Sequence, residues 1–182
     1  MSPMRQHVHH LRLRRRRGMK TYLPNQDEAI VAYRVARIRN SNNRGQSNIP
    51  GGENASIQQR KIQHYRAALA EIAVSRMTNL CWTGLGKGSL GCIDVGNLLE
   101  VRSIVNLRNG LLVRDKDKES LPYVLVHVDK NRLCTFLGWA FIEEVKRLGR
   151  VLDANTSKPA YILGQEKLHN MESLIEYVEK SR

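Results

Sequence analysis

Two carboxylates and an arginine stand close together in residues 92–103, which read CIDVGNLLEVRS. Gly96 and Asn97 favour a turn, and the apolar residues on either side are typical of strands. Asp94 precedes the turn and Glu100 follows it, so a hairpin would bring their carboxylates together. Two such carboxylates repel each other, and the pKa of one rises unless a cation binds between them. Oxygen ligands of this kind suit Mg²⁺ or Mn²⁺.

A divalent ion at this turn would support phosphodiester chemistry, because it polarises the phosphate and lowers the pKa of an attacking water. Side chains alternate along a strand, so Glu100 and Arg102 share one face. Arg102 would then hold the scissile phosphate and stabilise its developing negative charge. The spacing alone leaves a second interpretation open, in which Glu100 and Arg102 form an ion pair on a solvent-exposed face.

A third acid lies in a helix that we predict before this turn. Ser56 and Gln59 form a capping-box pattern, and the helix that follows ends near Leu80. Glu71 is the only acid in the segment AALAEIAVS. Either a functional site or an ordinary surface position would explain an acid there. The CWTGLGKGSLG stretch after the helix lacks the GxxxxGK[ST] order of a nucleotide-binding loop. We interpret it as a connector in which Lys87 can approach a nucleic-acid backbone.

The remaining pattern predicts a helix near the N-terminus, a run of strands and C-terminal helices. An Asn25–Glu28 capping box starts a helix through about Arg39, which puts Arg34 and Arg37 on neighbouring turns. Strands are predicted at residues 91–95, 98–105, 110–114, 123–128 and 133–137, and helices follow at WAFIEEVKRLGR and from Met171. This order predicts an α+β (mixed α/β) fold, with helices first, then a central mixed four- to five-stranded sheet, then flanking C-terminal helices.

The charge indicates a polyanionic partner. The chain has 182 residues and a formal net charge of +13. Residues 1–20 hold seven of the 30 basic residues and no acid, so residues 21–182 keep an excess of six positive charges. We predict a disordered basic arm over 1–20, unless Met19 is the true start, and a single domain over 21–182 with residues 21–55 as a helical extension. Nucleic acid is the partner that such a charge favours.

Cysteine usage and hydropathy exclude several classes of protein. Three cysteines without CxxC spacing argue against a disulfide framework or a cysteine zinc site and favour reduced thiols inside a cell. No apolar run approaches the roughly 18 residues of a membrane span, which argues against a membrane protein. The N-terminal residues also have no apolar signal-peptide region. We therefore expect an intracellular protein.

The succession of Glu71 in an alanine-rich helix, then IDVG, then LEVRS resembles the PD-(D/E)XK, or restriction-endonuclease-like, nuclease superfamily. The resemblance covers about residues 71–146, and GLLVRDKDKESLPYVLVHVDKNRLCTFLGWA is similar to the later strands of small viral and phage members. It implies a nuclease-like domain with a metal site formed by Glu71, Asp94 and Glu100, and with Arg102 at the position of the motif's lysine. An arginine stays protonated, so it cannot act as a general base there, although it still stabilises negative charge.

The resemblance implies a Mg²⁺- or Mn²⁺-dependent deoxyribonuclease, in the cytoplasm of a microbial or phage-infected host cell. The DNA would be bound by basic side chains of the first two helices and the connector, namely Arg34, Arg37, Arg60, Lys61 and Lys87. Two alternatives stay open. One is a catalytically inactive nuclease fold that serves as a DNA-binding or phage structural protein, and the other is a basic RNA- or ribosome-associated module. Many relatives of this fold are dimers, so a homodimer is a further expectation.

Overall fold

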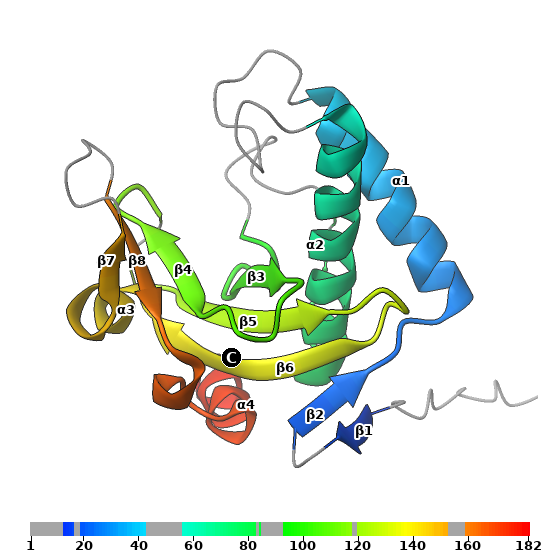
Figure 1. The fold of residues 1–182 in the computed structure, drawn as a ribbon. Helices are drawn as coiled ribbons and strands as arrows, with labels where there is room; N and C mark the ends of the chain where they lie inside the picture. Colours follow the sequence, from blue (N-terminus) through cyan, green and yellow to red (C-terminus); the bar gives the residue numbers. More distant parts are fainter. Residues whose placement is uncertain are drawn as a thin grey trace, which may run out of the picture.

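The computed structural model describes residues 13–16, 19–42, 56–82, 84, 93–117, 120–152 and 159–182. These residues form four α-helices and two β-sheets, which confirms the predicted α+β fold (Figure 1). The helices are α1 (Gln26–Asn42), α2 (Ile57–Thr78), α3 (Ile142–Leu148) and α4 (Met171–Lys180), with a short 3₁₀ helix, η2 (Gln165–Lys167).

The larger sheet has five strands in the order β1-β2-β6-β5-β3. The strands are β1 (Leu13–Arg16), β2 (Met19–Tyr22), β3 (Glu100–Ile104), β5 (Pro122–Val128) and β6 (Cys134–Phe141). β3 and β5 are parallel, whereas the other neighbouring strands are antiparallel. The sheet is therefore mixed, as predicted.

A smaller sheet, with the order β4-β8-β7, stands at one end of the larger one (Figure 1). Its strands are β4 (Leu111–Arg114), β7 (Arg150–Leu152) and β8 (Ala160–Leu163). The sequence predicted β4 but not β7 or β8. These two strands are three and four residues long, which is too short for a recognisable alternation. Their pairing with each other and with β4 defines them.

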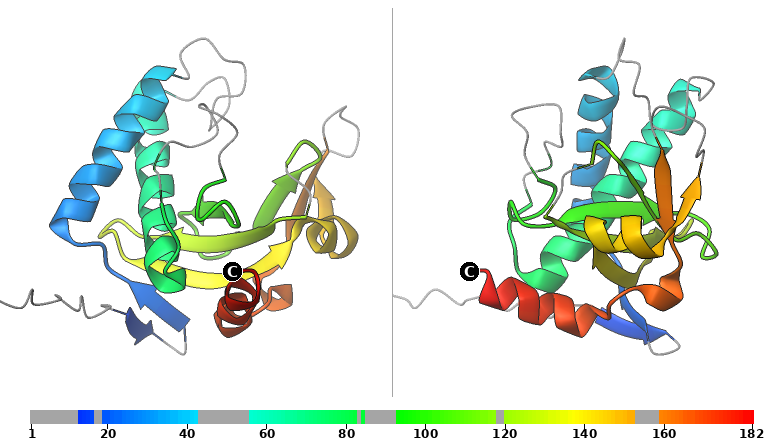
Figure 2. Two further views of the ribbon diagram at one scale, coloured as in Figure 1. Left: turned by 180° about the vertical axis from the view of Figure 1, so that it is seen from behind. Right: turned by 90° about the vertical axis from the view of Figure 1, so that its left-hand side faces the viewer.

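Two hydrophobic cores lie on opposite faces of β3 and β5, because alternate side chains of a strand point to opposite sides. The first core joins α2 to the larger sheet through buried residues that include Leu69, Ala73, Val101, Val124 and Val126. The second core includes Leu111, Val113, Tyr123, Leu125 and Ile142. α1 packs against α2 on the side away from the smaller sheet, and α4 lies along β6 (Figures 1 and 2).

Both predicted capping boxes are confirmed. The backbone N–H of Gln59 donates to Ser56 Oγ (3.1 Å), and the backbone N–H of Ser56 donates to Gln59 Oε1 (2.7 Å). Asn25 and Glu28 make the same reciprocal pair at the start of α1, at 2.8 and 2.9 Å. Among the described helices, none has both the length and the apolar character to cross a membrane.

The structure differs from the sequence prediction in several segments. The first three residues of the predicted WAFIEEVKRLGR helix continue strand β6 to Phe141, and α3 begins only at Ile142. Residues 13–16 and 19–22 form paired strands, and β2 pairs with β6 through Thr21 and Tyr22, although the first 20 residues were expected to form a disordered arm. The remaining residues of that arm, 1–12 and 17–18, lie outside the described residues. The strand predicted at 91–95 is replaced, in its described part, by a tight turn.

That turn reverses the chain just before β3. Gly96 and Asn97 have φ angles of 61° and 54°, a left-handed conformation that glycine and asparagine tolerate better than other residues. Val95 and Leu99 exchange backbone hydrogen bonds of 3.1 and 3.0 Å across it. The predicted reversal at Gly96-Asn97 is therefore confirmed, but it is shorter than a hairpin of two full strands.

The two described cysteines are expected to differ in reactivity. Cys134 is buried in β6, and burial raises the pKa of its thiol to about 12, whereas Cys81 is exposed. Because the thiolate is the reactive form, we expect Cys81 to react with a thiol reagent at pH 8 in the native protein and Cys134 to react only after unfolding. Labelling of a Cys92→Ser variant, in native buffer and in denaturant, measures this. Equal rates for both thiols in native buffer would contradict it.

Candidate functional site

Glu71 lies in the C-terminal half of α2 and is only 3% exposed. Arg39, in the last turns of α1, donates from Nη1 to Glu71 Oε1 (2.8 Å) and from Nη2 to Oε2 (2.7 Å). The indole Nε1 of Trp82 donates a third hydrogen bond to Oε2 (2.7 Å). Glu71 is thus a buried, fully engaged carboxylate and not a surface acid among small residues.

Asp94 lies in the turn before β3 and is half-buried. Its Oδ2 accepts a hydrogen bond from the backbone N–H of Val101 (2.9 Å), which ties the turn to the strand. The charge of Asp94 also acts on both members of the neighbouring Arg39–Glu71 ion pair. We call Glu71 and Asp94 the acid pair. Arg39 is the arginine that interacts with both of them.

Burial raises the pKa of the Glu71 carboxyl, and the negative charge of Asp94 raises it further. The hydrogen bonds from Arg39 and Trp82 act in the opposite direction, and the net result is a pKa of about 7. A raised pKa on a buried acid beside a second acid is a feature that functional sites share. Asp94 therefore repels Glu71 electrostatically, whereas the sequence predicted such repulsion between Asp94 and Glu100.

Glu100 begins β3 and is fully buried. It stands in register with Tyr123 of β5, on the face of the sheet that carries the second core. Val101, the next residue, points to the opposite face and packs in the first core with α2. Glu100 therefore does not belong to a solvent-exposed ion pair, which was the alternative that the spacing left open.

Arg102 shares the face of Glu100 and is held by three neighbours. Its Nη2 donates to Asp117 Oδ2 (2.8 Å), and its guanidinium lies 5.0 Å from the centre of the Tyr123 ring. Burial opposes the positive charge, but Asp117, Glu100 and Tyr123 outweigh it and raise the pKa of Arg102. Arg102 stays a cation, so it can stabilise negative charge but cannot accept a proton.

The charge of Asp94 thus acts on Glu71, whereas Glu100 and Arg102 lie on the face of β3 that carries the second core. In the described part of the chain, no group of three His, Cys, Asp or Glu side chains is arranged to hold a metal ion. The convergence of all three acids stays a prediction. Carboxylate oxygens are the ligands that Mg²⁺ and Mn²⁺ prefer, but both oxygens of Glu71 are engaged by Arg39 and Trp82.

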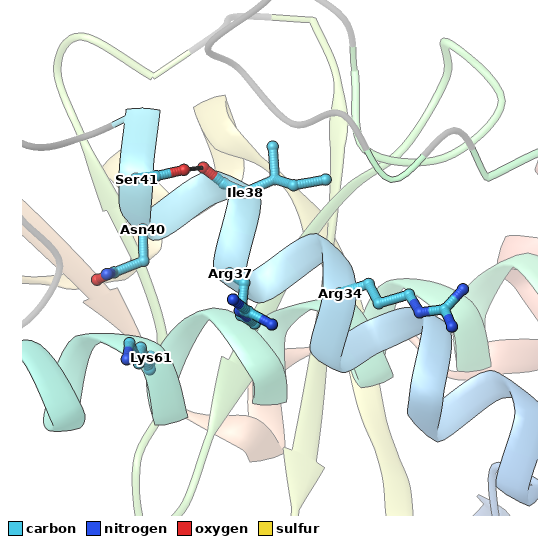
Figure 3. Close-up of a pocket in the computed structure, with 6 residues that line it drawn as sticks. All are labelled: Arg34, Arg37, Ile38, Asn40, Ser41 and Lys61. Atoms are coloured by element: carbon cyan, nitrogen blue, oxygen red, sulfur yellow. Dashed lines mark hydrogen bonds between the residues drawn. The ribbon is translucent and has the colours of Figure 1, made fainter.

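Basic side chains of α1 and α2 line a surface pocket. Arg34, Arg37 and Lys61 line an open pocket of about 500 Å³ together with Ile38, Asn40 and Ser41 (Figure 3). Arg34 and Arg37 are exposed, which suits contacts with phosphate groups. Arg60 is half-buried, and its Nε is buried without a hydrogen-bond partner. Lys87 lies outside the described residues.

Sequence reasoning missed three residues that hold the acids and Arg102 in place: Arg39, Trp82 and Asp117. Arg39 is 32 residues from Glu71 along the chain, and no local pattern connects them. The ring of Trp82 packs against the first core, and its indole N–H reaches Glu71, 11 residues earlier in the chain. Asp117 lies in a polar turn, where an acid carries no signal of its own.

The described residues define an α+β protein with a buried acidic centre on a mixed sheet and a basic helical surface. Comparison of the chain with family models, curated proteins and solved structures gave no match. A functional assignment therefore depends on the chemistry of these two features.

Proposed function

We propose that the protein is a metal-dependent nuclease that hydrolyses DNA phosphodiester bonds, a member of the PD-(D/E)XK superfamily that the sequence resembles. The observation that supports this most is the buried carboxylate of Glu71, whose pKa burial and the charge of Asp94 raise. Acids with a pKa perturbed in this way cluster at functional sites. An acid-rich centre beside a surface with excess positive charge suits chemistry on a polyanion.

In this proposal Glu71 and Asp94 would hold Mg²⁺ or Mn²⁺, whereas Glu100 lies on the opposite face of β3. Such an ion, when bound, supplies Lewis-acid polarisation of the phosphate and an activated water. Arg102 lies with Glu100 on that opposite face, where it is bound to Asp117, so its fixed positive charge is not directed at the Glu71–Asp94 centre. Because Arg102 stays protonated, the proton of the attacking water has to go to another group.

The basic pocket on α1 and α2 would bind the DNA backbone. Replacing Arg34, Arg37 and Lys61 together with glutamine removes three phosphate contacts. We expect the DNA affinity at about 0.1 M salt to fall by at least about tenfold, and the slope of log affinity against log salt to become shallower by about two to three units. Fluorescence anisotropy with labelled duplex DNA at several salt concentrations measures both quantities.

A matched variant separates this surface from the effect of net charge. Lys130, Arg147 and Lys180 are exposed and lie on other elements, and their replacement with glutamine removes the same total charge. We expect this control variant to lose less affinity and to keep most of the salt slope. Equal losses in the two triple variants would mean that the pocket is not the binding surface.

The catalytic part of the proposal is tested by incubating the protein with DNA in Mg²⁺, Mn²⁺ or EDTA. Single-stranded DNA, duplex DNA and RNA are compared as substrates. We expect cleavage of DNA in Mg²⁺ or Mn²⁺ and none in EDTA. Salt-dependent DNA binding without cleavage in either metal would contradict it, and a preference for RNA would favour the RNA-associated alternative.

The bidentate pairing of Arg39 with Glu71 favours a second candidate function. Both oxygens of Glu71 bind the guanidinium of Arg39. While that contact lasts, the two residues form a structural ion pair. On this interpretation the protein is a catalytically inactive nuclease fold that binds DNA. DNA binding would then be unaffected by metal, and replacing the acids would change stability only.

A further inference from the structure

A pair of tyrosines lies where α1 and α2 pack together. Tyr33 of α1 and Tyr65 of α2 meet edge to face, with ring centroids 6.4 Å apart and an angle of 77° between the ring planes. Tyr65 is half-buried and packs against the first core, whereas Tyr33 is 54% exposed. Tyr65 therefore holds the Tyr33 ring in place, and much of the surface of the Tyr33 ring stays open to solvent.

The tyrosine pair lies one helical turn from the basic pocket. Tyr33 is four residues before Arg37 on α1, and Tyr65 is four residues after Lys61 on α2. Side chains four residues apart on a helix are neighbours, with Cβ atoms about 5–6 Å apart. Arg37 and Lys61 line the same pocket, one from each helix, together with Arg34 (Figure 3). The rings and the cations therefore form one continuous surface, which we call the α1–α2 surface.

The charge of this surface fits a polyanion. The two helices carry seven basic residues, three on α1 and four on α2, against three acidic ones. Glu28 and Glu71 are buried and each is paired with an arginine, so Asp27, in the first turn of α1, is the only exposed acid of these two helices. This excess of exposed positive charge favours a partner that carries phosphate groups.

An exposed aromatic ring beside cations suits a nucleotide, because the base stacks on the ring while the phosphate contacts the cations. Proteins that hold single strands combine these two features in one groove. In a duplex, neighbouring base pairs cover both faces of each base, and exposing a face costs unstacking. Tyr33 therefore reaches the bases of an unpaired strand, whereas Arg34, Arg37 and Lys61 contact the phosphates of either form.

We propose that the α1–α2 surface binds single-stranded nucleic acid, with a base stacked on Tyr33 and adjacent phosphates on Arg37 and Lys61. This inference rests on the proposed function for the kind of partner, and it adds the form of that partner. The phosphate contacts supply affinity without sequence information, and stacking supplies the preference for an unpaired strand. DNA and RNA strands share this chemistry, because both present base faces and phosphates.

The test measures binding by fluorescence anisotropy in EDTA, which prevents metal-dependent cleavage. The labelled probes are a DNA strand of about 12 nucleotides, the size that single-strand sites cover, the RNA strand of the same sequence, the DNA duplex, and a strand of the same length in which every base is removed. We expect the base-bearing DNA or RNA strand to bind at least about tenfold more tightly than the abasic strand. Equal affinities for the base-bearing and abasic strands would overturn the inference. The tighter of the DNA and RNA strands identifies the source of the ligand.

Tyr33→Ala isolates the contribution of the ring. We expect this variant to lose about tenfold in affinity for the base-bearing strand and to bind the abasic strand as wild type does, because its phosphate contacts are intact. Unchanged binding of the abasic strand also shows that the variant is folded. Tyr33→Phe should keep the wild-type affinity, since stacking needs the ring and not the hydroxyl. The inference is wrong if Tyr33→Ala binds the base-bearing strand as tightly as wild type, or loses as much affinity for the abasic strand.

Val31→Ala is the matched control, because Val31 is also on α1 and is 43% exposed but has no ring. We expect its affinity for each probe to equal that of wild type. An equal loss in Val31→Ala and Tyr33→Ala would assign the effect to apolar surface in general and overturn the inference. Sedimentation of the free protein tests a second copy as the occupant. A wild-type dimer that Tyr33→Ala dissociates would place the ring in an interface between copies, which would also overturn it.

The outcomes separate this inference from the proposed function. Strand binding that depends on Tyr33, with no cleavage of any substrate, would keep the stacking role and reject the nuclease proposal. Metal-dependent cleavage of DNA, with strand binding unchanged in Tyr33→Ala, would keep the nuclease proposal and reject the role of Tyr33.

Discussion

Replacing Asp94 with asparagine is expected to lower the metal-dependent cleavage of DNA by at least about 1,000-fold, which corresponds to about 4 kcal/mol of transition-state stabilisation. The asparagine oxygen can still accept the hydrogen bond from the backbone N–H of Val101, so the turn before β3 should keep its shape. Only the charge is lost, and with it one ligand that the proposed ion would have. Single-turnover cleavage rates in Mg²⁺ and Mn²⁺ measure the effect.

The stability of this variant should not fall, because Asp94 repels the buried Glu71 and its charge raises the pKa of that carboxyl. Asp129→Asn is the matched control. Asp129 also holds a turn through hydrogen bonds from backbone N–H groups, those of Asn131 and Leu133, but it lies in the β5–β6 connection. We expect the control to cleave DNA at the wild-type rate. An Asp94→Asn variant as active as wild type would remove Asp94 from the proposed site.

The second large effect is expected on stability, at Glu28. This carboxylate is 7% exposed and accepts hydrogen bonds from the hydroxyl of Tyr22, the backbone N–H of Asn25 and Nε of Arg76. Burial, helped by Glu28, raises the pKa of Tyr22, so its hydroxyl stays a donor. Glu28→Ala removes the shared acceptor and leaves the buried hydroxyl unpaired. We expect the free energy of unfolding to fall by about 3 kcal/mol.

Chemical denaturation in urea measures this change. Glu172→Ala is the control, because Glu172 also lies in the first turn of a helix and forms an ion pair, with Lys20 at 2.8 Å, but its side chain is 60% exposed. Solvent screens such a pair, so the control should lose no more than about 0.5 kcal/mol. Similar losses in both variants would show that Glu28 acts only through the helix end and not through its buried contacts.

The helices were predictable because their signals are local. Each capping box joins residues three positions apart, so the starts of α1 and α2 follow from the order of a few side chains. The turn at Gly96-Asn97 is local in the same sense, since its residue types tolerate the left-handed backbone that the turn requires. From these elements the order of helices and strands, and with it the α+β fold, could be derived.

The short strands and the partners of the charged residues were not predictable. β7 and β8 exist because they pair with each other and with β4, and pairing between distant segments leaves little trace in three or four residues. Alternation along β3 correctly put Glu100 and Arg102 on one face. It could not say that this face is covered by a second core, which buries Glu100 completely.

The sequence by itself determined which residues carry charge, which of them lie on helices or strands, and that two acids border the turn before β3. Only the tertiary structure decided how these charges are paired. It exposed Glu71 to the charge of Asp94 and gave Glu71 an arginine from another helix. The reason is physical: periodicity fixes the direction of a side chain relative to its own element, whereas its ionic partner depends on how the elements pack. That packing minimises the free energy of the whole chain and is not encoded within any short segment.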